Sequence, residues 1–445
     1  MRGIRPILAL LALALAGPAA ADPPFAPAAA GERVVYRGAT LIDGTGAAPR
    51  PDMAVITDGE RIEAVLPAAA LRPDATSGAR IVELRGRFLL PGLIDSHQHR
   101  ATPPDREAAE RQMRRDLYHG ITAARIMADD IRQIAELARA AHAGEIAGPD
   151  FGFAALIAGR SFFADPRVAA VSAGYQPGEA PWAQAIDADS DLPLAIARAR
   201  GTGATAIKIY ADLPAGLVRR IAAEAHRQGL LVWAHFMVFP ATPAEVIAAG
   251  PDTVSHTCYG AYQITPNPPR TYRERFPIDP APFANGDNAR MAALFRRMRE
   301  RGVLLDATLN VYREIERRRA DGAAPHCTLD LAARLTAQAH RAGVLISAGT
   351  DADAPDDAEY PSLFGEMELL VRRAGFTPLE AIGAATRIGA MTLGKGREMG
   401  VIAPGYLANM VVLARDPTAD IANMRSVQFT VKRGRRFDRA AQAGR

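Results

Sequence analysis

Apolar and polar positions along the middle of the chain follow one repeated pattern, in which an amphipathic stretch ends at a glycine and a short apolar run comes next. A glycine just past a helix end, followed by a buried strand, is the connection typical of parallel sheets. Two of these connections nearly repeat in sequence, at residues 225–229 and 339–343. The pattern predicts strands at residues 121–124, 204–210, 230–234, 253–255, 303–309 and 344–348.

Two further apolar runs, one that begins at Phe88 and one at residues 151–157, bring the predicted strands to eight. Eight strand–helix units over residues 88–390 predict a TIM (β/α)8 barrel of the α/β class. Two of the connections are long, residues 158–193 and 258–290. Long connections on a barrel usually carry function, often as lids, although surface decoration is the alternative.

The two ends of the chain read differently from the middle. Residues 33–88 contain short β-like runs separated by glycine turns, and β-like runs return after Ala390. The predicted strands are residues 34–36, 54–56, 61–65, 81–84, 400–402, 409–413 and 427–431. The simplest architecture is a composite β-sandwich domain formed by residues 22–87 and 391–445, with the barrel inserted between the two segments.

The first 21 residues have the pattern of a secretory signal peptide: an arginine-bearing start, an apolar stretch and a small-residue cleavage site. A retained membrane anchor is the alternative, but the apolar stretch is too short to span a bilayer. We therefore expect a secreted, periplasmic protein without stable membrane insertion. In an oxidising compartment Cys258 and Cys327 are able to pair, and the sequence leaves open whether they do.

Charge excludes one class of partner. The net charge of +4 is modest for 445 residues, and no basic run carries interleaved aromatic residues. Nucleic acid binding is therefore not expected. A small-molecule substrate is expected, and homo-oligomerisation is left open.

Chemistry-bearing side chains gather at the ends of the predicted strands, where barrel active sites lie. His97 and His99 are two residues apart, so in an extended strand both imidazoles face one way. The full set of candidate metal ligands at these strand ends is His97, His99, Lys208, His235, His256 and Asp351. The other five histidines fall near helix ends or in a loop and are not assigned to metal: His119, His142, His226, His326 and His340.

Lys208 is one of only three lysines, and it lies inside the apolar run 206–210. Burial lowers the pKa of a lysine and favours the neutral amine, which carbon dioxide converts to a carbamate. Such an anion is able to bridge two metal ions, whereas arginine cannot form it. A lysine that reaches solvent or pairs with an acid is the alternative.

The chain resembles the amidohydrolase superfamily, in the branch that holds imidazolonepropionases and prolidase-like peptidases. The resemblance rests on residues 90–99, on Gly349-Thr350-Asp351 and on residues 400–409, where the family usually has Asp in place of Asn409. It implies one metal at His97, His99 and Asp351, a second at His235 and His256, and a bridging carboxylated Lys208. Two zinc ions per chain are expected, although other divalent ions fit.

Two departures bear on the substrate. Prolidase-like members usually carry a Gly/Ser-rich insertion after the lysine strand, and here residues 212–214 lead directly into a helix. This departure puts a dipeptide substrate in doubt. Imidazolonepropionases work with one metal and no carboxylated lysine, so Lys208 argues against that activity.

The resulting hypothesis is a secreted metal-dependent amidohydrolase that cleaves an amide or peptide-type C–N bond, such as that of an N-acyl amino acid or dipeptide, by metal-activated hydroxide. Asp351 is the candidate catalytic residue and proton carrier, and Tyr210 the candidate substrate-binding residue. The alternatives are hydrolysis of a lactone, ester or cyclic amide at the same site, or a periplasmic binding protein without catalysis.

The signal peptide yields the first testable prediction. Protein recovered from the producing cell is expected to begin near Asp22, because cleavage follows the small residues 19–21. N-terminal sequencing of the native protein measures this directly. Bulk protein that begins at Met1 or Arg2 would contradict it.

Overall fold

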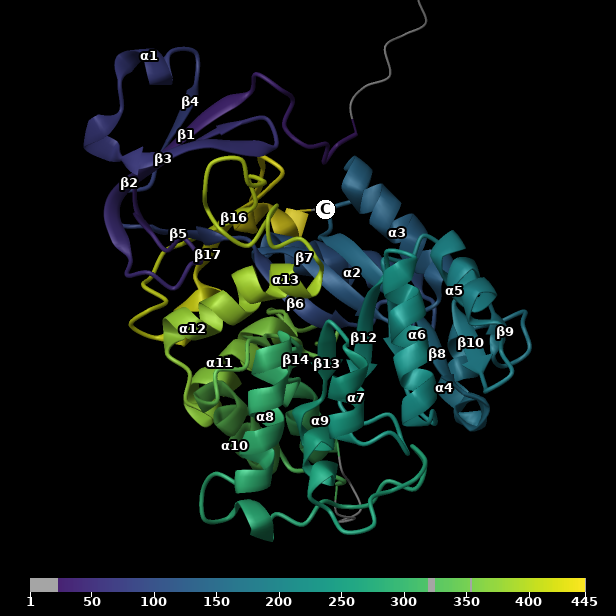
Figure 1. Ribbon diagram of the computed structural model, residues 1–445. Helices are drawn as coiled ribbons and strands as arrows, with labels where there is room; N and C mark the ends of the chain where they lie inside the picture. The colour runs from purple at the N-terminus through teal and green to yellow at the C-terminus, as the bar shows by residue number, and fades with distance from the viewer. Residues whose placement is uncertain (1–22, 319–324, 353, 445) are drawn as a thin grey trace, which may run out of the picture.

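The computed structural model describes residues 23–318, 325–352 and 354–444, so the predicted signal peptide lies outside the described residues. Two β-sheets form the core of the molecule (Figure 1). One is a parallel barrel surrounded by helices, and the other is a mixed sheet built from both ends of the chain. The fold class predicted from the sequence, a TIM barrel together with a β domain, is confirmed.

The barrel contains eight strands in chain order, and each lies within or overlaps one of the eight predicted apolar runs. Its strands are β6 (Leu93–Gln98), β7 (Ile121–Met127), β8 (Asp150–Gly159), β11 (Ala206–Ile209), β12 (Leu231–His235), β13 (Thr253–Ser255), β14 (Leu304–Asp306) and β15 (Ile346–Ser347). The first and last strands meet where the Ser96 amide donates to the Ala348 carbonyl at 2.9 Å. Most of these strand residues are buried, as expected for a sheet covered on both faces.

Each strand is followed by an outer helix, which places the strand ends on one face of the barrel. These helices are α2 (Arg106–Tyr118), α3 (Ile131–Ala143), α5 (Leu192–Gly201), α6 (Ala215–Arg227), α7 (Pro243–Ala249), α8 (Ala289–Arg301), α10 (Leu329–Arg341) and α11 (Ser362–Ala374). Helix α8 shows why the sequence pattern is regular. Asn288 caps its start by accepting from the Arg290 and Met291 amides, and Gly302 ends it in the left-handed region at φ 69°.

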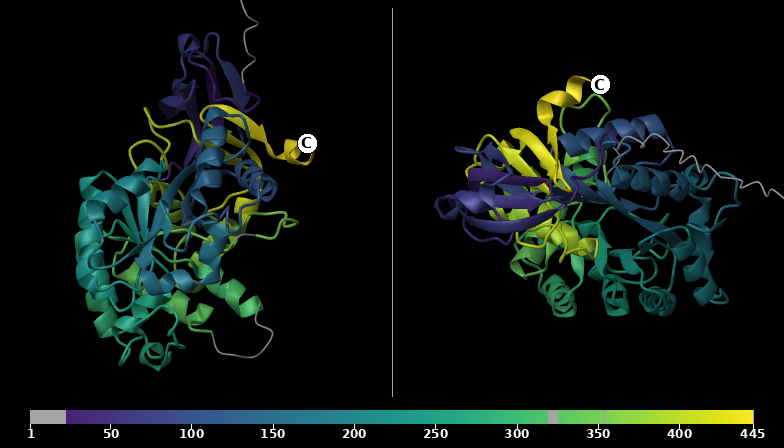
Figure 2. Two further views of the ribbon diagram at one scale, coloured as in Figure 1. Left: turned by 90° about the vertical axis from the view of Figure 1, so that its right-hand side faces the viewer. Right: turned by 90° about the horizontal axis from the view of Figure 1, so that it is seen from above.

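The β domain joins strands from the two ends of the chain in one hydrogen-bonded order, β18-β17-β16-β5-β1-β2-β3, with β4 beside β1. In Figure 2 the purple N-terminal strands and the yellow C-terminal strands lie together in both views. The strands are β1 (Arg33–Leu41), β2 (Arg50–Asp58), β3 (Arg61–Pro67), β4 (Arg80–Glu83), β5 (Phe88–Pro91), β16 (Met410–Leu413), β17 (Val427–Lys432) and β18 (Arg435–Asp438). One apolar cluster, which includes Tyr36, Val55, Met410 and Phe429, draws on both ends.

Two sequence predictions at the edges of this domain are wrong. Phe88 was assigned to the barrel, but β5 pairs with β16 and β1, and the barrel begins at β6. Residues 400–402 form no strand. Gly400 turns the chain at φ 87°, and the Ile402 amide donates one backbone hydrogen bond, to the Asp43 carbonyl. Strand β18 was not predicted.

The two long connections carry short elements of their own. The first contains α4 (Pro166–Val171) and the strands β9 (Glu179–Ala180) and β10 (Ala183–Ile186).

A disulfide between Cys258 and Cys327 joins the connections that follow β13 and β14. The connection after β14 also contains α9 (Leu309–Arg318). The pairing that the sequence left open is therefore present. In the described part of the chain, no helix combines the length and apolar character needed to cross a bilayer.

The shared sheet predicts the effect of a C-terminal truncation. Removal of residues 399–445 takes away β16, the antiparallel partner of β5, and part of the apolar cluster. We expect the truncated chain to aggregate or to lose its cooperative melting transition, since it exposes a sheet edge and apolar surface. Circular dichroism melting and gel filtration measure this outcome. The control removes only residues 440–445, and an unchanged melting temperature for the long truncation would contradict the shared sheet.

Candidate metal centre

A cavity of about 450 Å³ opens at the C-terminal ends of the barrel strands. Every site residue predicted from the sequence lines it: His97, His99, Lys208, Tyr210, His235, His256 and Asp351. The barrel therefore brings together five segments, in or just after β6, β11, β12, β13 and β15, that are far apart in the sequence.

His97, His99 and Asp351 form the tightest group in this cavity. The Nε2 atoms of His97 and His99 lie 3.3 Å and 3.2 Å from Asp351 Oδ1. Potential ligand atoms of the three residues all lie within 4.8 Å of one another, and no other such group of His, Cys, Asp and Glu occurs among the described residues. Two imidazole nitrogens and a carboxylate oxygen that converge in this way suit a transition metal.

Two buried carboxylates orient the imidazoles of this group. His97 Nδ1 donates to Asp306 Oδ2 at 2.6 Å, and His99 Nδ1 donates to Asp129 Oδ1 at 2.8 Å. Because Nδ1 of each ring carries the donated proton, Nε2 is the nitrogen left to bind a metal when the ring is neutral. Carboxylates that hold the second nitrogen of a ligating histidine are a recurrent feature of metal sites.

Asp95 locks the first strand to the segment that carries Asp351. Its carboxylate accepts from the Thr350 amide at 3.1 Å, from the Thr350 hydroxyl at 2.9 Å and from the His97 amide at 3.0 Å. The Asp351 amide in turn donates to the His97 carbonyl at 3.0 Å. Gly349 is required here, since a Cβ would lie 2.2 Å from Asp306 Oδ1.

The charges around His99 and Asp351 favour a positive charge at this position. Burial disfavours the charged imidazole of His99, but Asp129 and Asp351 outweigh this effect and raise its pKa to about 10. Burial likewise opposes the Asp351 carboxylate, yet His97, His256 and His99 hold its pKa well below the usual range. Asp351 itself adopts a left-handed conformation at φ 46°, a strain that is typical of functional sites.

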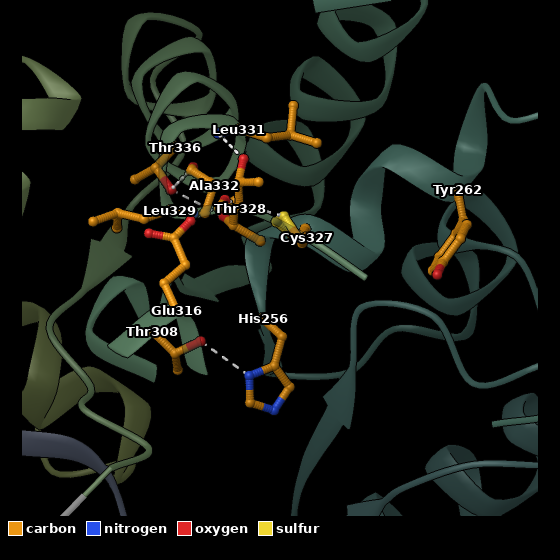
Figure 3. Close-up of a disulfide and its surroundings, with 12 residues drawn as sticks. His256, Tyr262, Thr308, Glu316, Cys327, Thr328, Leu329, Leu331, Ala332 and Thr336 are labelled. Carbon is orange, nitrogen blue, oxygen red and sulfur yellow. Dashed lines mark hydrogen bonds between the residues drawn. A yellow bond between two sulfur atoms is a disulfide. The ribbon is translucent and has the colours of Figure 1, made fainter. Parts of the chain in front are cut away.

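His235 and His256 lie on the other side of Asp351. His256 Nδ1 is 3.6 Å from Asp351 Oδ2 and shares a hydrogen bond of 3.0 Å with the Thr308 hydroxyl, as Figure 3 shows. The rings of His235 and His256 are 4.8 Å apart. Burial lowers the pKa of both imidazoles, to about 4 for His256. His235 Nδ1 is buried and makes no hydrogen bond within the described chain, so it remains available as a ligand.

Lys208 is buried in β11, and its Nζ donates a hydrogen bond of 3.4 Å to Ser255 Oγ. It forms no salt bridge of 4.0 Å or less with any described acid, and its exposure is 1%, so neither alternative considered for this lysine applies. Burial lowers the pKa of Lys208 to about 7, Arg125 lowers it further, and Asp306 and Asp351 oppose the shift. The amine is thus able to exist uncharged near neutral pH.

An aromatic wall forms the side of the cavity next to His235. The Tyr210 ring lies 4.0 Å from the His235 ring and 5.5 Å from that of Tyr272. Burial raises the pKa of Tyr210, and so does the neighbouring Tyr272 hydroxyl. Tyr210 therefore keeps its proton and is able to donate a hydrogen bond into the cavity.

Sequence reasoning missed the residues that support the ligands. Asp306 ends β14 and Asp129 follows β7, so the strand-end rule applied to every strand would have found both. Arg125, a fully buried cation in the middle of β7, gives no such positional signal. Among the histidines not assigned to metal, His326 lines the cavity and stacks on Tyr259, whereas His226 and His340 pair with Asp252 and Glu380.

Comparisons with known proteins agree with this geometry. Over 131 residues the chain is 33% identical to ochratoxinase from Aspergillus niger, a stretch that covers 28% of this chain and 26% of that protein. The chain thus matches about a quarter of the length of this curated relative. The crystal structure of A. niger ochratoxinase superposes with a TM-score of 0.72 at 22% identity, covering 92% of this chain and 96% of that one.

A second solved structure, a Xaa-Pro dipeptidase with methionine bound in its active site, has a TM-score of 0.71 at 22% identity. The likeness covers 92% of this chain and all of that one, and it establishes the shared fold. The model of the amidohydrolase family matches residues 88–437, which is most of the chain. The protein therefore belongs to the amidohydrolase family.

Proposed function

We propose that the protein is an exported, two-zinc amidohydrolase that cleaves the amide or peptide bond of a small molecule such as an N-acyl amino acid or dipeptide. The observation that carries this proposal is the convergence of His97 Nε2, His99 Nε2 and Asp351 Oδ1 within one cavity. Export is proposed from the N-terminal pattern alone. The family match and the names of the relatives, a dipeptidase and ochratoxinase, support the bond class.

The donor set fits the expected metal. His97, His99 and Asp351 would hold one ion, and His235, His256 and a carboxylated Lys208 would hold a second, with the Lys208 carbamate shared between them. The buried Nδ1 of His235, which has no partner in the described chain, fits this assignment. Bound there, zinc supplies Lewis-acid activation of water and of the scissile carbonyl.

Asp351 lies between the two groups of histidines, with Oδ1 towards His97 and His99 and Oδ2 towards His256. In this position its carboxylate orients the attacking water, accepts its proton and passes the proton to the leaving nitrogen. The neutral Tyr210 hydroxyl donates a hydrogen bond to the carbonyl oxygen as negative charge develops there. The aromatic wall excludes bulk water from this side of the cavity.

A substrate screen tests the proposed reaction. Purified protein incubated with zinc is expected to hydrolyse at least one compound from a panel of N-acyl amino acids, dipeptides, cyclic amides and lactones. Dialysis against a chelator is expected to remove the activity and zinc to restore it, as measured by release of the free amine, or of acid in the case of the lactones. Turnover confined to lactones would contradict the amide assignment, and turnover that survives complete metal removal would contradict the metal.

Lys208 gives a sharper prediction about the bridge. Lys208→Ala is expected to lose at least one of two metal ions and most activity, because the bridging anion is gone. Lys208→Arg should fare no better, since guanidinium keeps its charge and forms no carbamate. A short-chain carboxylic acid is expected to restore part of the activity of the alanine variant by occupying the vacated space. Elemental analysis of metal per chain, together with rate measurements, gives the result.

Lys395→Ala is the matched control, because Lys395 is exposed and, among the residues that the structure describes, pairs only with Glu398 at 2.9 Å. One metal per chain in metal-replete wild type, combined with an active Lys208→Arg variant, would rule out the bridge. The site would then be a mononuclear one formed by His97, His99, His235 and Asp351, with His256 as an acid–base partner.

A further inference from the structure

Arg275 is a partly buried arginine of the cavity that has no carboxylate partner among the described residues. Arg275 lies in the long connection after β13 and lines the same cavity as the candidate metal ligands. Its Nε donates to the Tyr272 carbonyl at 2.6 Å and its Nη1 to the Tyr259 hydroxyl at 2.6 Å. Its Nη2 makes no hydrogen bond, and the guanidinium forms no salt bridge, within the described part of the chain.

The other arginines of the cavity wall are in different situations. Arg167 donates twice to Asp165, at 3.0 Å and 2.8 Å, so its charge is already matched by a carboxylate. Arg318 is exposed, where water solvates the guanidinium. Arg275 is only partly exposed, and a buried cation without an anion is costly. The half-buried, unmatched guanidinium therefore points to an anion that comes from outside the chain.

The surroundings hold Arg275 in one orientation. Its guanidinium lies over the Tyr272 ring, 3.4 Å from the centroid, and two hydrogen bonds hold its other edge. A guanidinium fixed in this way presents its remaining N–H groups to a planar acceptor without a large loss of rotamer freedom. Planar carboxylates match this fork, and the bonds are charge-assisted.

The position of Arg275 relative to the candidate metal centre sets where this anion lies. The Tyr272 ring stacks against the His235 ring, with centroids 5.9 Å apart, and Arg275 lies on Tyr272. One aromatic ring therefore separates the guanidinium from a candidate metal ligand. A carboxylate a few bonds from the scissile amide would span this interval.

We propose that Arg275 binds a carboxylate of the substrate, on the side of the scissile bond next to His235. The substrate class is an amide whose amine product carries a carboxylate near the cleaved nitrogen. This inference rests on the proposed amide hydrolysis, but it concerns recognition rather than bond cleavage, so the two fail separately. Arg275 acts as a binding residue that determines specificity.

Matched pairs of compounds test this assignment. N-acetyl-L-phenylalanine and N-acetyl-L-leucine are compared with N-acetyl-2-phenylethylamine and N-acetyl-3-methylbutylamine, which lack only the carboxylate. The zinc-loaded wild type is expected to favour the carboxylates by about 10- to 100-fold in kcat/KM, the range expected for a charge-assisted hydrogen bond. Arg275→Gln is expected to abolish this preference, mainly through KM. Arg275→Lys is expected to retain part of it, since the charge remains.

Binding is measured separately by calorimetry, with L-phenylalanine and L-leucine against 2-phenylethylamine and 3-methylbutylamine. The amino acids are expected to bind more tightly to wild type, and Arg275→Gln is expected to remove the difference. Arg270→Gln is the control, because Arg270 is an exposed residue of the same connection. Circular dichroism checks that each variant is folded.

The outcomes separate the two ideas. Carboxylate binding that depends on Arg275, without hydrolysis of any pair or of any amide in the panel, would support the role of Arg275 and overturn the amide reaction. Hydrolysis with equal rates for both members of each pair, unchanged in Arg275→Gln, would overturn the proposed role of Arg275 and leave the amide reaction in place. If the wild type shows no preference for carboxylates in either rates or binding, the proposed role of Arg275 is also wrong, and this result does not depend on the folding of any variant.

Discussion

The barrel interior depends on one buried ion pair, Arg125 with Asp306, whose atoms Nη2 and Oδ2 are 2.9 Å apart. Both side chains are inaccessible to solvent, and removal of one partner from such a pair costs about 3–5 kcal/mol. Arg125 also donates from Nε to the Ser96 carbonyl at 2.6 Å, so the pair ties β7 to β6 and to β14 across the barrel. The same Asp306 oxygen accepts from His97 and from Ser255, which places a metal ligand and the partner of Lys208 on one anion. Closure of the barrel and orientation of the site thus rest on the same contact.

The charge arrangement explains why this interior suits a metal. Asp306 accepts from His97, and Asp129 and Asp351 face His99 and raise the pKa of its imidazole, so these carboxylates favour a positive charge at this position. A divalent cation at this position would satisfy the same carboxylates. Lys208, whose pKa is lowered by burial and by Arg125, is the one group near the centre that would gain a negative charge on carboxylation. Stability of the fold and affinity for cations therefore come from the same buried acids.

The sequence predicted those features that depend on local pattern. Glycine after each helix and an apolar run after each glycine revealed the strands, and the strand-end rule of barrels then located the histidines. The boundary at Phe88 was missed because residues 88–94 read as one apolar run. The separation occurs at Gly92, whose amide bonds to the Asn409 carbonyl at 2.8 Å and where a Cβ would lie 2.3 Å from the Thr122 hydroxyl. Such a constraint comes from a strand more than three hundred residues away, and no local pattern carries it.

The contacts of Arg275 and Tyr272 lie furthest beyond sequence reasoning, since they depend on the path of a long connection. That path is fixed by distant contacts: the Ile278 amide donates to the His326 carbonyl at 2.9 Å, and the Cys258–Cys327 disulfide holds the neighbouring residue. The candidate metal ligands project from the barrel strands or lie just after them, whereas Arg275, Tyr272 and Arg167 lie on connections outside the barrel. Connections tolerate sequence change better than buried strands do. In the proposed function the same division separates two roles: the barrel would hold the candidate metal ligands in place, and the connections would select the substrate.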